Sequence, residues 1–213
     1  MVGFDTATPA IGVALHDGAR IVASATTVDA RRQGELLAPM ITKVMADAGA
    51  DRKDLTGVAV GVGPGPYTGL RVGLVTARVL GDVLGIPVHG VCTLDVIAAA
   101  AEPAGQAEFL VATDARRKEV YWARYDVTGR RTDGPWVGPA SDIDGAQALP
   151  VAGNGGTIYP EAFGEQLAPA YPDARVLCEI AVRGGPELLP PEPLYLRRPD
   201  AREPGAPKRV TQP

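Results

Sequence analysis

The sequence predicts an α/β fold built on mixed sheets. Three short apolar segments at the N-terminus have the spacing of an antiparallel meander. Strands that alternate with helices follow them, which is typical of α/β proteins. A fainter meander begins near Glu108, as expected for a duplicated unit. With 213 residues, of which 46% are hydrophobic, the chain is long enough for one large domain or two small lobes.

The N-terminal meander is predicted from apolar alternation and one turn. Val2–Phe4 and Ile11–Leu15 are the first two strands, and Arg20–Thr26 is the third. Asp17-Gly18, between the second and third strands, is a strong hairpin signal. The first strand is unusually short, which leaves open whether the natural start lies upstream.

Helices and buried strands alternate after the meander. Apolar residues at i, i+1, i+4 and i+5 predict an amphipathic helix over Glu35–Ala48, and Gly49 ends it. We expect Thr68 to cap a second helix that runs to about Leu84. The other elements of this half are the strands Val58–Val62 and Val88–Val91 and the helix Thr93–Ala101.

A second unit is predicted from Glu108 onward. Its first two strands are Glu108–Thr113 and Glu119–Asp126. In each unit the first strand is followed by an aspartate, Asp5 or Asp114, and then by a second strand and a turn. This order is what a duplicated meander would leave in the sequence.

The predicted organisation is two lobes and a tail. We assign residues 1–104 to an N-terminal lobe and residues 105–198 to a smaller C-terminal lobe. Proline and charged residues dominate near the end of the chain, so residues 199–213 are expected to form a flexible tail.

Composition excludes several classes of protein. The net charge of −4 argues against binding of nucleic acid through a large basic face. Cys92 and Cys178 stand singly, so two buried thiols in a reducing compartment are favoured over a disulfide or a zinc knuckle. The sequence contains neither an apolar run long enough to span a bilayer nor a signal peptide pattern, so we expect a cytoplasmic protein without membrane contact.

The histidines argue against a metallohydrolase. His16 and His89 have no second His and no Cys at metal-ligand spacing. No G-x-S-x-G motif is present either, so a serine hydrolase is not supported. We therefore predict no metal site.

The segment Gly63–Gly73 is the most informative part of the sequence. It joins a buried strand to a helix, where backbone N–H groups and the helix dipole favour an anion. It lacks the Lys-Ser/Thr pair of a Walker loop, and Pro64 and Pro66 remove two N–H donors. The alternative is a rigid turn whose glycines serve conformation and packing.

The helix after this segment carries small residues at every fourth position, namely Gly69, Gly73, Ala77 and Gly81. A glycine inside a helix costs roughly 1 kcal/mol relative to alanine, so a close approach must compensate. Either a helix of another protein or the chain's own sheet could supply it, and the sequence leaves both open.

Asp5 and Asp114 are candidates for a catalytic pair. Actin-like phosphotransferases hold phosphates and a metal at such strand ends, and a second carboxylate comes from the other lobe. Aspartates after strands are also common turn and capping residues. This second interpretation is the simpler one.

Four segments together resemble the TsaB family. They are Phe4–Thr8, Gly63–Gly73, Asp114–Arg116 with Glu119–Tyr121, and Pro193–Arg197. The resemblance runs in order over most of the chain, to about Arg198. The glycine-rich segment is the specific part of it. Gln33-Gly34-Glu35 differs from the His-Ser-Glu of many members, and Pro66-Tyr67 from the usual Ser-Phe.

The resemblance implies an actin-like fold, shared with sugar kinases and Hsp70 ATPase domains, with two ribonuclease-H-like lobes and mixed sheets. It also implies a non-catalytic subunit without cofactor or catalytic residues, which binds and activates a catalytic TsaD-type subunit. A TsaE-type ATPase joins them. Their product is threonylcarbamoyladenosine next to the anticodon of tRNAs that read codons beginning with adenine, and tRNA contact by this chain is expected to be indirect.

The resemblance places the partner contact on the first two helices, which agrees with the apolar stripe and the small-residue face. The predicted partner-binding residues are Leu36, Leu37, Met40, Ile41, Val44, Gly69, Leu70, Gly73, Ala77 and Gly81. A homodimer through the same helices is expected when the partner is absent. Leu37→Asp or Gly73→Leu should then break the contact and leave the fold largely intact.

A vestigial phosphate-binding site is implied at Asp5, Thr6, Gly63, Gly65 and Thr68. Two other functions remain as alternatives. One is an actin-like phosphotransferase that uses Asp5 and Asp114 around ATP. The other is a metallopeptidase, suggested by the family's historical glycoprotease label and opposed by the two isolated histidines.

Overall fold

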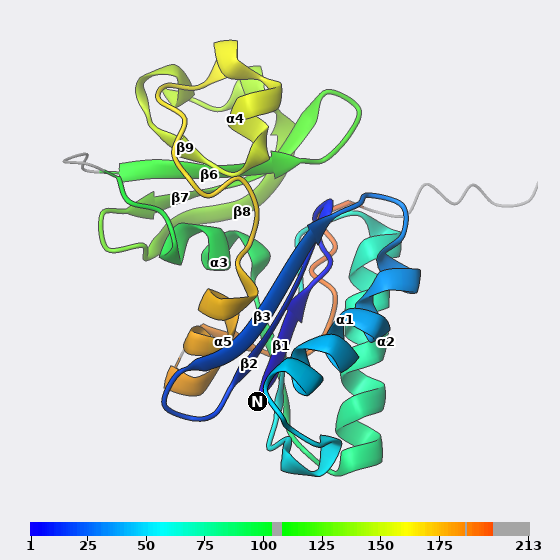
Figure 1. Cartoon of the computed structure of the whole chain (residues 1–213). Coiled ribbons are helices and arrows are strands. Elements are labelled where there is room, and N and C mark those ends of the chain that lie inside the picture. The colour runs from blue at the N-terminus through cyan, green and yellow to red at the C-terminus, as the bar shows by residue number, and fades with distance from the viewer. Residues whose placement is uncertain (104–107, 186, 198–213) are drawn as a thin grey trace, which may run out of the picture.

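The protein has two lobes, each built on a mixed sheet (Figure 1). The computed structural model describes residues 1–103, 108–185 and 187–197. The predicted lobe boundary at 104/105 and the predicted tail at 199–213 lie outside these residues.

The first lobe contains a six-stranded sheet in the order β10-β5-β4-β1-β2-β3. Its strands are β1 (Val2–Asp5), β2 (Ala10–His16), β3 (Ile21–Val28), β4 (Val58–Gly61), β5 (Val88–Val91) and β10 (Leu188–Leu189). The first three strands pair antiparallel, which confirms the predicted meander. β4 pairs parallel with β1, and β5 pairs parallel with β4.

Helices cover both faces of this sheet (Figure 1). α1 (Gln33–Asp47) and α2 (Tyr67–Leu84) pack on one face, and α5 (Ala174–Arg183) packs on the other. The apolar core of the lobe lies mainly under α1 and α2, where burial of each large aliphatic side chain contributes about 1.5–3 kcal/mol.

α5 approaches the sheet closely because two strand positions lack a side chain. A Cβ atom at Gly3 would lie 2.4 Å from Sγ of Cys178, and one at Gly12 would lie 3.2 Å from Cβ of Ala174. α5 therefore packs closely on the first sheet, and β10 is the edge strand of that sheet, paired with β5. The prediction that residues 105–198 form one lobe is wrong for these two elements, because the chain returns to the first lobe after it leaves the second.

The second sheet repeats the topology of the first. Its order is β8-β7-β6-β9, with β6 (Glu108–Asp114), β7 (Glu119–Asp126), β8 (Arg131–Pro139) and β9 (Val151–Ala152). β6, β7 and β8 form an antiparallel meander, and β9 pairs parallel with β6. This matches β1 to β4 and confirms the predicted α/β fold with two ribonuclease-H-like lobes.

The remaining elements are short. They are α3 (Thr93–Ala99), α4 (Asn154–Ile158) and the 3-10 turns Arg52–Asp54, Ala140–Asp142, Ala146–Ala148 and Pro160–Ala162. α3 contacts both β6 of the second lobe and α5 of the first, so it lies at the junction. In the part of the chain that the structure describes, no helix combines the length and the apolar composition needed to cross a membrane.

Cys92 and Cys178 are both buried and unbridged, which confirms the predicted pair of buried thiols. Burial raises the pKa of each thiol to about 12. Both side chains are therefore protonated at neutral pH and pack as small apolar groups.

Candidate functional site

A cavity of about 340 Å³ lies between the lobes, at the ends of their first strands. Its lining includes Thr8, Arg31, Gln33, Thr68, Asp114 and Asn154. In the fold predicted from the sequence, a nucleotide phosphate would lie here. The contacts of the predicted site residues decide what this cleft can do.

Asp5 ends β1 but does not line the cleft. Its side chain is fully buried. The carboxylate accepts hydrogen bonds from Oγ1 of Thr93 at 2.7 Å and from the backbone N–H of Ala7 at 2.6 Å. Burial is the largest influence on its pKa and raises it. Asp5 thus joins β1 to the start of α3 inside the core.

Asp114 ends β6 and lies at the cleft. Its Oδ2 forms an ion pair with Nη1 of Arg116 at 3.3 Å, and its Oδ1 accepts a hydrogen bond from the backbone N–H of Arg116. Asn154 holds the backbone, because its Oδ1 accepts from the N–H of Asp114 at 3.1 Å. Since Asp5 is turned into the core, the two aspartates do not face one cavity.

The glycine-rich loop is packed against the strand ends. Gly63 has a φ of +96°, and its N–H donates to Oγ1 of Thr93 at 3.2 Å. A Cβ at Gly65 would lie 2.3 Å from the carbonyl oxygen of Ala7. These contacts support the rigid-turn interpretation, in which the glycines permit close approach and a left-handed conformation.

The predicted vestigial phosphate site is only partly assembled. Thr6 connects β1 to α2, because its Oγ1 donates to the carbonyl oxygen of Gly69 and accepts from the N–H of Gly73. Thr68 lines the cleft, but it lies inside the first turn of α2, and Pro66 is the N-cap. The expectation that Thr68 caps the helix is therefore wrong.

The small-residue face of α2 packs on the chain's own sheet. A Cβ at Gly73 would lie 2.7 Å from Oγ1 of Thr6, and one at Gly81 would lie 2.4 Å from Cγ2 of Val88. Ala77 is completely buried between them. In this conformation the face is covered by the strands, so the alternative of a groove open to a partner helix is wrong.

The apolar stripe of α1 also faces inward. Leu37, Ile41 and Val44 are buried in the same core as Leu70 of α2. Of the predicted partner-binding residues, Leu36 and Met40 are partly exposed. Leu37 is buried and a Cβ at Gly73 would lie against Thr6, so we now expect a charge at Leu37 or a leucine at Gly73 to destabilise the fold as well.

The outward face of α2 carries an apolar row that the sequence analysis did not select. Val75, Val79 and Val83 are 56%, 53% and 77% exposed. They lie at i, i+4 and i+8, so they form one stripe along the helix. The spacing of the valines is a signal in the sequence itself, but spacing alone does not tell which face of a helix is exposed.

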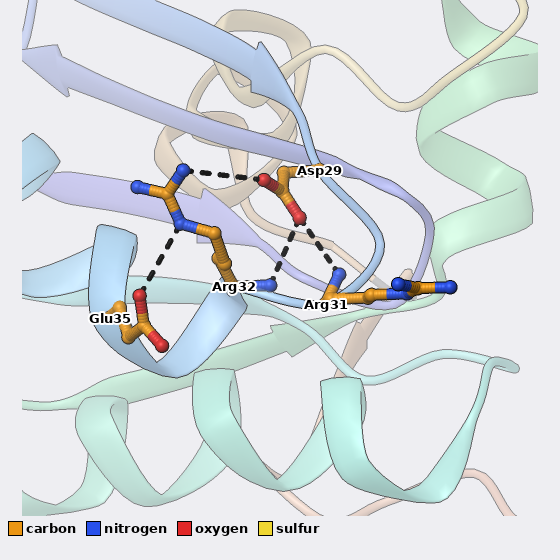
Figure 2. Close-up of polar contacts among 4 residues, drawn as sticks. All are labelled: Asp29, Arg31, Arg32 and Glu35. Atoms are coloured by element: carbon orange, nitrogen blue, oxygen red, sulfur yellow. Dashed lines mark hydrogen bonds and ion pairs between the residues drawn. The ribbon is translucent and has the colours of Figure 1, made fainter.

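Asp29 organises the turn that leads into α1 (Figure 2). Its Oδ1 accepts from the backbone N–H groups of Arg31 at 2.9 Å and Arg32 at 3.1 Å. The side chain of Arg32 lies between two carboxylates. Its Nη1 is 3.8 Å from Oδ2 of Asp29, and its Nε is 3.3 Å from Oε2 of Glu35. The side chain of Arg31 points away from this group (Figure 2), and Arg31 lines the same cleft as Asp114.

The histidines stay apart. Nδ1 of the buried His16 accepts from the backbone N–H of Gly18, and His89 lies in β5 beside Ala59. Within residues 1–103, 108–185 and 187–197, no three His, Cys, Asp or Glu side chains are grouped as a metal site would require. Gln33, at the start of α1, lines the cleft.

Known proteins resemble the chain over nearly its whole length. A family model described as TsaD, tRNA N6-adenosine threonylcarbamoyltransferase, matches residues 21–155. An uncharacterized protein of Mycobacterium tuberculosis is 44% identical over 207 residues, which cover 95% of this chain and 93% of that protein. The tRNA threonylcarbamoyladenosine biosynthesis protein TsaB of Escherichia coli is 31% identical over 221 residues, covering 92% of this chain and 94% of that protein.

A solved structure agrees with these sequence relatives. YeaZ from Pseudomonas aeruginosa superimposes with a TM-score of 0.77 at 30% identity, covering 92% of this chain and 98% of that one. One assignment follows from the two lobes of repeated topology, the packed glycine-rich loop and the relatives in sequence and structure. The chain belongs to the TsaB family.

Proposed function

We propose that this protein is a non-catalytic subunit needed to make threonylcarbamoyladenosine next to the anticodon of tRNAs reading codons that begin with adenine. It acts by binding and activating a catalytic TsaD-type subunit, with which a TsaE-type ATPase also assembles. The name of the E. coli relative supports the pathway. We place this activity in the cytoplasm.

The exposed valine stripe of α2 carries the proposal for the contact. Val75, Val79 and Val83 form a continuous apolar row on a helix whose other face is already packed. Exposed apolar rows of this kind are used by partner proteins, because their burial removes apolar surface from water. Leu36 and Met40 of α1 are partly exposed, and we include them in the proposed contact.

The residues predicted to bind the partner have two different roles in this proposal. The buried residues Leu37, Val44, Leu70 and Ala77 hold α1 and α2 on the sheet. The valines and the partly exposed residues of α1 touch the partner. In the absence of the catalytic subunit, the same surface joins two copies of this chain.

A pull-down with the TsaD-type protein of the same organism tests the contact. The double variant Val79→Asp/Val83→Asp should weaken binding at least about 30-fold, because loss of two central contacts costs about 2 kcal/mol or more. The melting temperature should stay near that of the native chain, since both side chains are exposed. Light scattering should also show loss of any homodimer.

Val127→Asp is the matched control, because Val127 is as exposed as Val79 at 53% but lies in the turn between β7 and β8. It should bind like the native chain. Native yield of the TsaD-type protein with the double variant would refute the interface. Calorimetric titration of the chain with ATP and Mg²⁺ tests the non-catalytic role. Turnover of ATP by the native chain that Asp5→Asn abolishes would overturn that role.

A further inference from the structure

The edges of the two sheets are not protected equally. β9 and β10 have two residues each, and β9 is bridged to Gln166. β8 is long, but it contains Pro135 and Pro139, two charged residues and an irregular register with β7. Short length, proline, charge and irregular pairing are the usual means of keeping a sheet edge from pairing with another chain. β3, at the remaining edge, is neither short nor interrupted by proline or charge.

β3 is an eight-residue strand whose composition favours pairing. Its sequence, Ile-Val-Ala-Ser-Ala-Thr-Thr-Val, is rich in β-branched residues. From Ala23 to Val28 its register with β2 is continuous, and the irregularity lies at the Ile21 end. Within residues 1–103, 108–185 and 187–197, β3 pairs with β2 and with no other strand. The backbone N–H and C=O groups on its outer side are therefore available to an added strand.

The two faces of β3 differ. Ala23 and Ala25 are partly buried against the core under α1. The alternate residues are exposed, and they are Val22, Ser24, Thr26 and Val28. The exposed row is thus apolar at its ends and carries hydroxyl groups in the middle. A strand that extends the sheet here must offer apolar side chains beside the valines and small polar ones between them.

A second copy of β3 meets this requirement in one antiparallel register. Paired residues of antiparallel strands point to the same face, so exposed residues must lie opposite exposed residues. When Ala25 lies opposite its own copy, Val22 lies opposite Val28, and Ser24 lies opposite Thr26. Apolar side chains then meet apolar ones and hydroxyl groups meet hydroxyl groups, which are pairs that stabilise sheets.

The next allowed registers are less favourable. A shift by two residues in one direction places Val28 opposite Arg20, and a shift in the other direction places it opposite Ser24. Charges beyond the strand permit the pairing centred on Ala25. Asp17 and Arg20 precede β3, and Asp29 and Arg32 follow it. Groups of both signs therefore lie at each end, and no block of like charge opposes the contact.

We propose that β3 joins two copies of this chain edge to edge, as an antiparallel pair centred on Ala25. The two six-stranded sheets become one continuous sheet across a two-fold axis. This surface differs from the valine stripe of the proposed partner contact. α2 packs against β4 and β5, whereas β1 and β2 separate β3 from β4. The two surfaces can therefore be tested one at a time.

Sedimentation velocity of the full-length chain over a range of concentrations tests this pairing. The background is Val79→Asp/Val83→Asp, which blocks the contact proposed for α2, and this protein should still form dimers. Adding Ser24→Lys/Thr26→Lys places like charges opposite each other, so dimerisation should weaken about tenfold or more. Adding Ser24→Lys/Thr26→Glu instead places opposite charges across the pair in the same register, so dimerisation should be restored.

Thr132→Lys/Ser141→Lys is the matched control, because it adds the same charge at exposed residues of the second lobe. It should dimerise as the background protein does. The proposal is overturned if the background protein is a monomer at every concentration, or if the double-lysine variant of β3 dimerises like the control. A lysine–glutamate variant as weak as the double-lysine variant of β3 would refute the antiparallel register.

Hydrogen exchange of the native chain decides the question should the lysine variant fail to fold. The backbone N–H groups of β3 that point away from β2 should become protected as the concentration rises, because they bond to the second copy. Exchange that does not change with concentration would contradict the pairing. Neither measurement contains a TsaD-type protein, so the outcome is independent of the proposed partner contact.

Discussion

Asp5 and Asp114 occupy equivalent positions in the two lobes but have opposite environments. Each ends the first strand of its meander. Asp5 is fully buried and is held by Thr93 and the backbone of Ala7. Asp114 lines the cleft and pairs with Arg116, whose side chain is 65% exposed.

The residues beside the two strand ends explain the difference. Beside Asp5, β4 ends in Gly61, and a Cβ there would lie 1.9 Å from Oδ2 of Asp5. The missing side chain gives the carboxylate room to turn into the core. Beside Asp114, Asn154 bonds the backbone instead, and the carboxylate remains at the cleft. A duplicated unit can therefore use one of its equivalent residues for structure and leave the other at the cleft.

Gly61→Ala should produce the largest change, because the added methyl group overlaps the carboxylate of Asp5. We expect a loss of about 3 kcal/mol in the free energy of unfolding, measured by urea denaturation. Gly138→Ala in β8 is the control, since a Cβ there meets nothing within 4 Å. The double variant Gly61→Ala/Asp5→Ala should lose less than the sum of the single losses. Full additivity would argue against this account of the buried position.

Asp5→Ala should lower the free energy of unfolding by about 2 kcal/mol, because the hydroxyl of Thr93 and the N–H of Ala7 lose a buried acceptor. Asp114→Ala should cost less than about 1 kcal/mol, since its partner Arg116 is mostly exposed and such ion pairs contribute little. Thermal melting of both variants measures the difference. Equal losses would mean that the two strand ends are not energetically distinct.

The pH dependence of stability should differ between the native chain and Asp5→Asn. Burial raises the pKa of Asp5 above its ordinary value of 3.8. The folded state then binds more protons than the unfolded state between these two pKa values, so stability falls as pH rises through that window. The slope is at most about 1.4 kcal/mol per pH unit for one group.

Urea denaturation from about pH 4 to about pH 7 measures this slope. Asp5→Asn cannot ionise, so its stability should fall less than that of the native chain over the same window. Parallel curves for the two proteins would contradict the assigned environment of Asp5.

Lys118→Gly should have the smallest effect and the opposite sign. Lys118 has a φ of +63° in the turn after Asp114, and glycine adopts this conformation without steric cost. We expect a gain of about 0.5 kcal/mol. Lys53→Gly is the control in a turn without positive φ, where glycine should destabilise the protein. A loss at Lys118 would show that the turn is supported by contacts of its side chain.

Local patterns predicted much of the first lobe. Alternation and a turn signal located the meander, and helical periodicity located α1 to within two residues of its start. β8 was not predicted, because Gly134, Pro135 and Pro139 interrupt its pattern. α5 was missed as well, although its buried residues have helical spacing, because its ten residues lie in a proline-rich part of the chain.

The candidate site was predicted less well than the fold. The sequence drew attention to the glycine-rich loop and the two aspartates, but the directions of their side chains were not predictable. Whether a carboxylate faces a cleft or a core depends on the space beside it, and that space belongs to another strand. The same holds for Tyr67 and Tyr195, which stack although 128 residues separate them (195 − 67).

The sequence by itself determined the fold class, the duplication and the family, because these follow from local periodicity, turn residues and one specific segment. Only the tertiary structure decided that the small-residue face of α2 lies on the sheet and that its valines face outward. A helical pattern defines two faces but not which one is covered. The cover comes from segments elsewhere in the chain, here from Thr6, directly after β1, and from Val88 of β5.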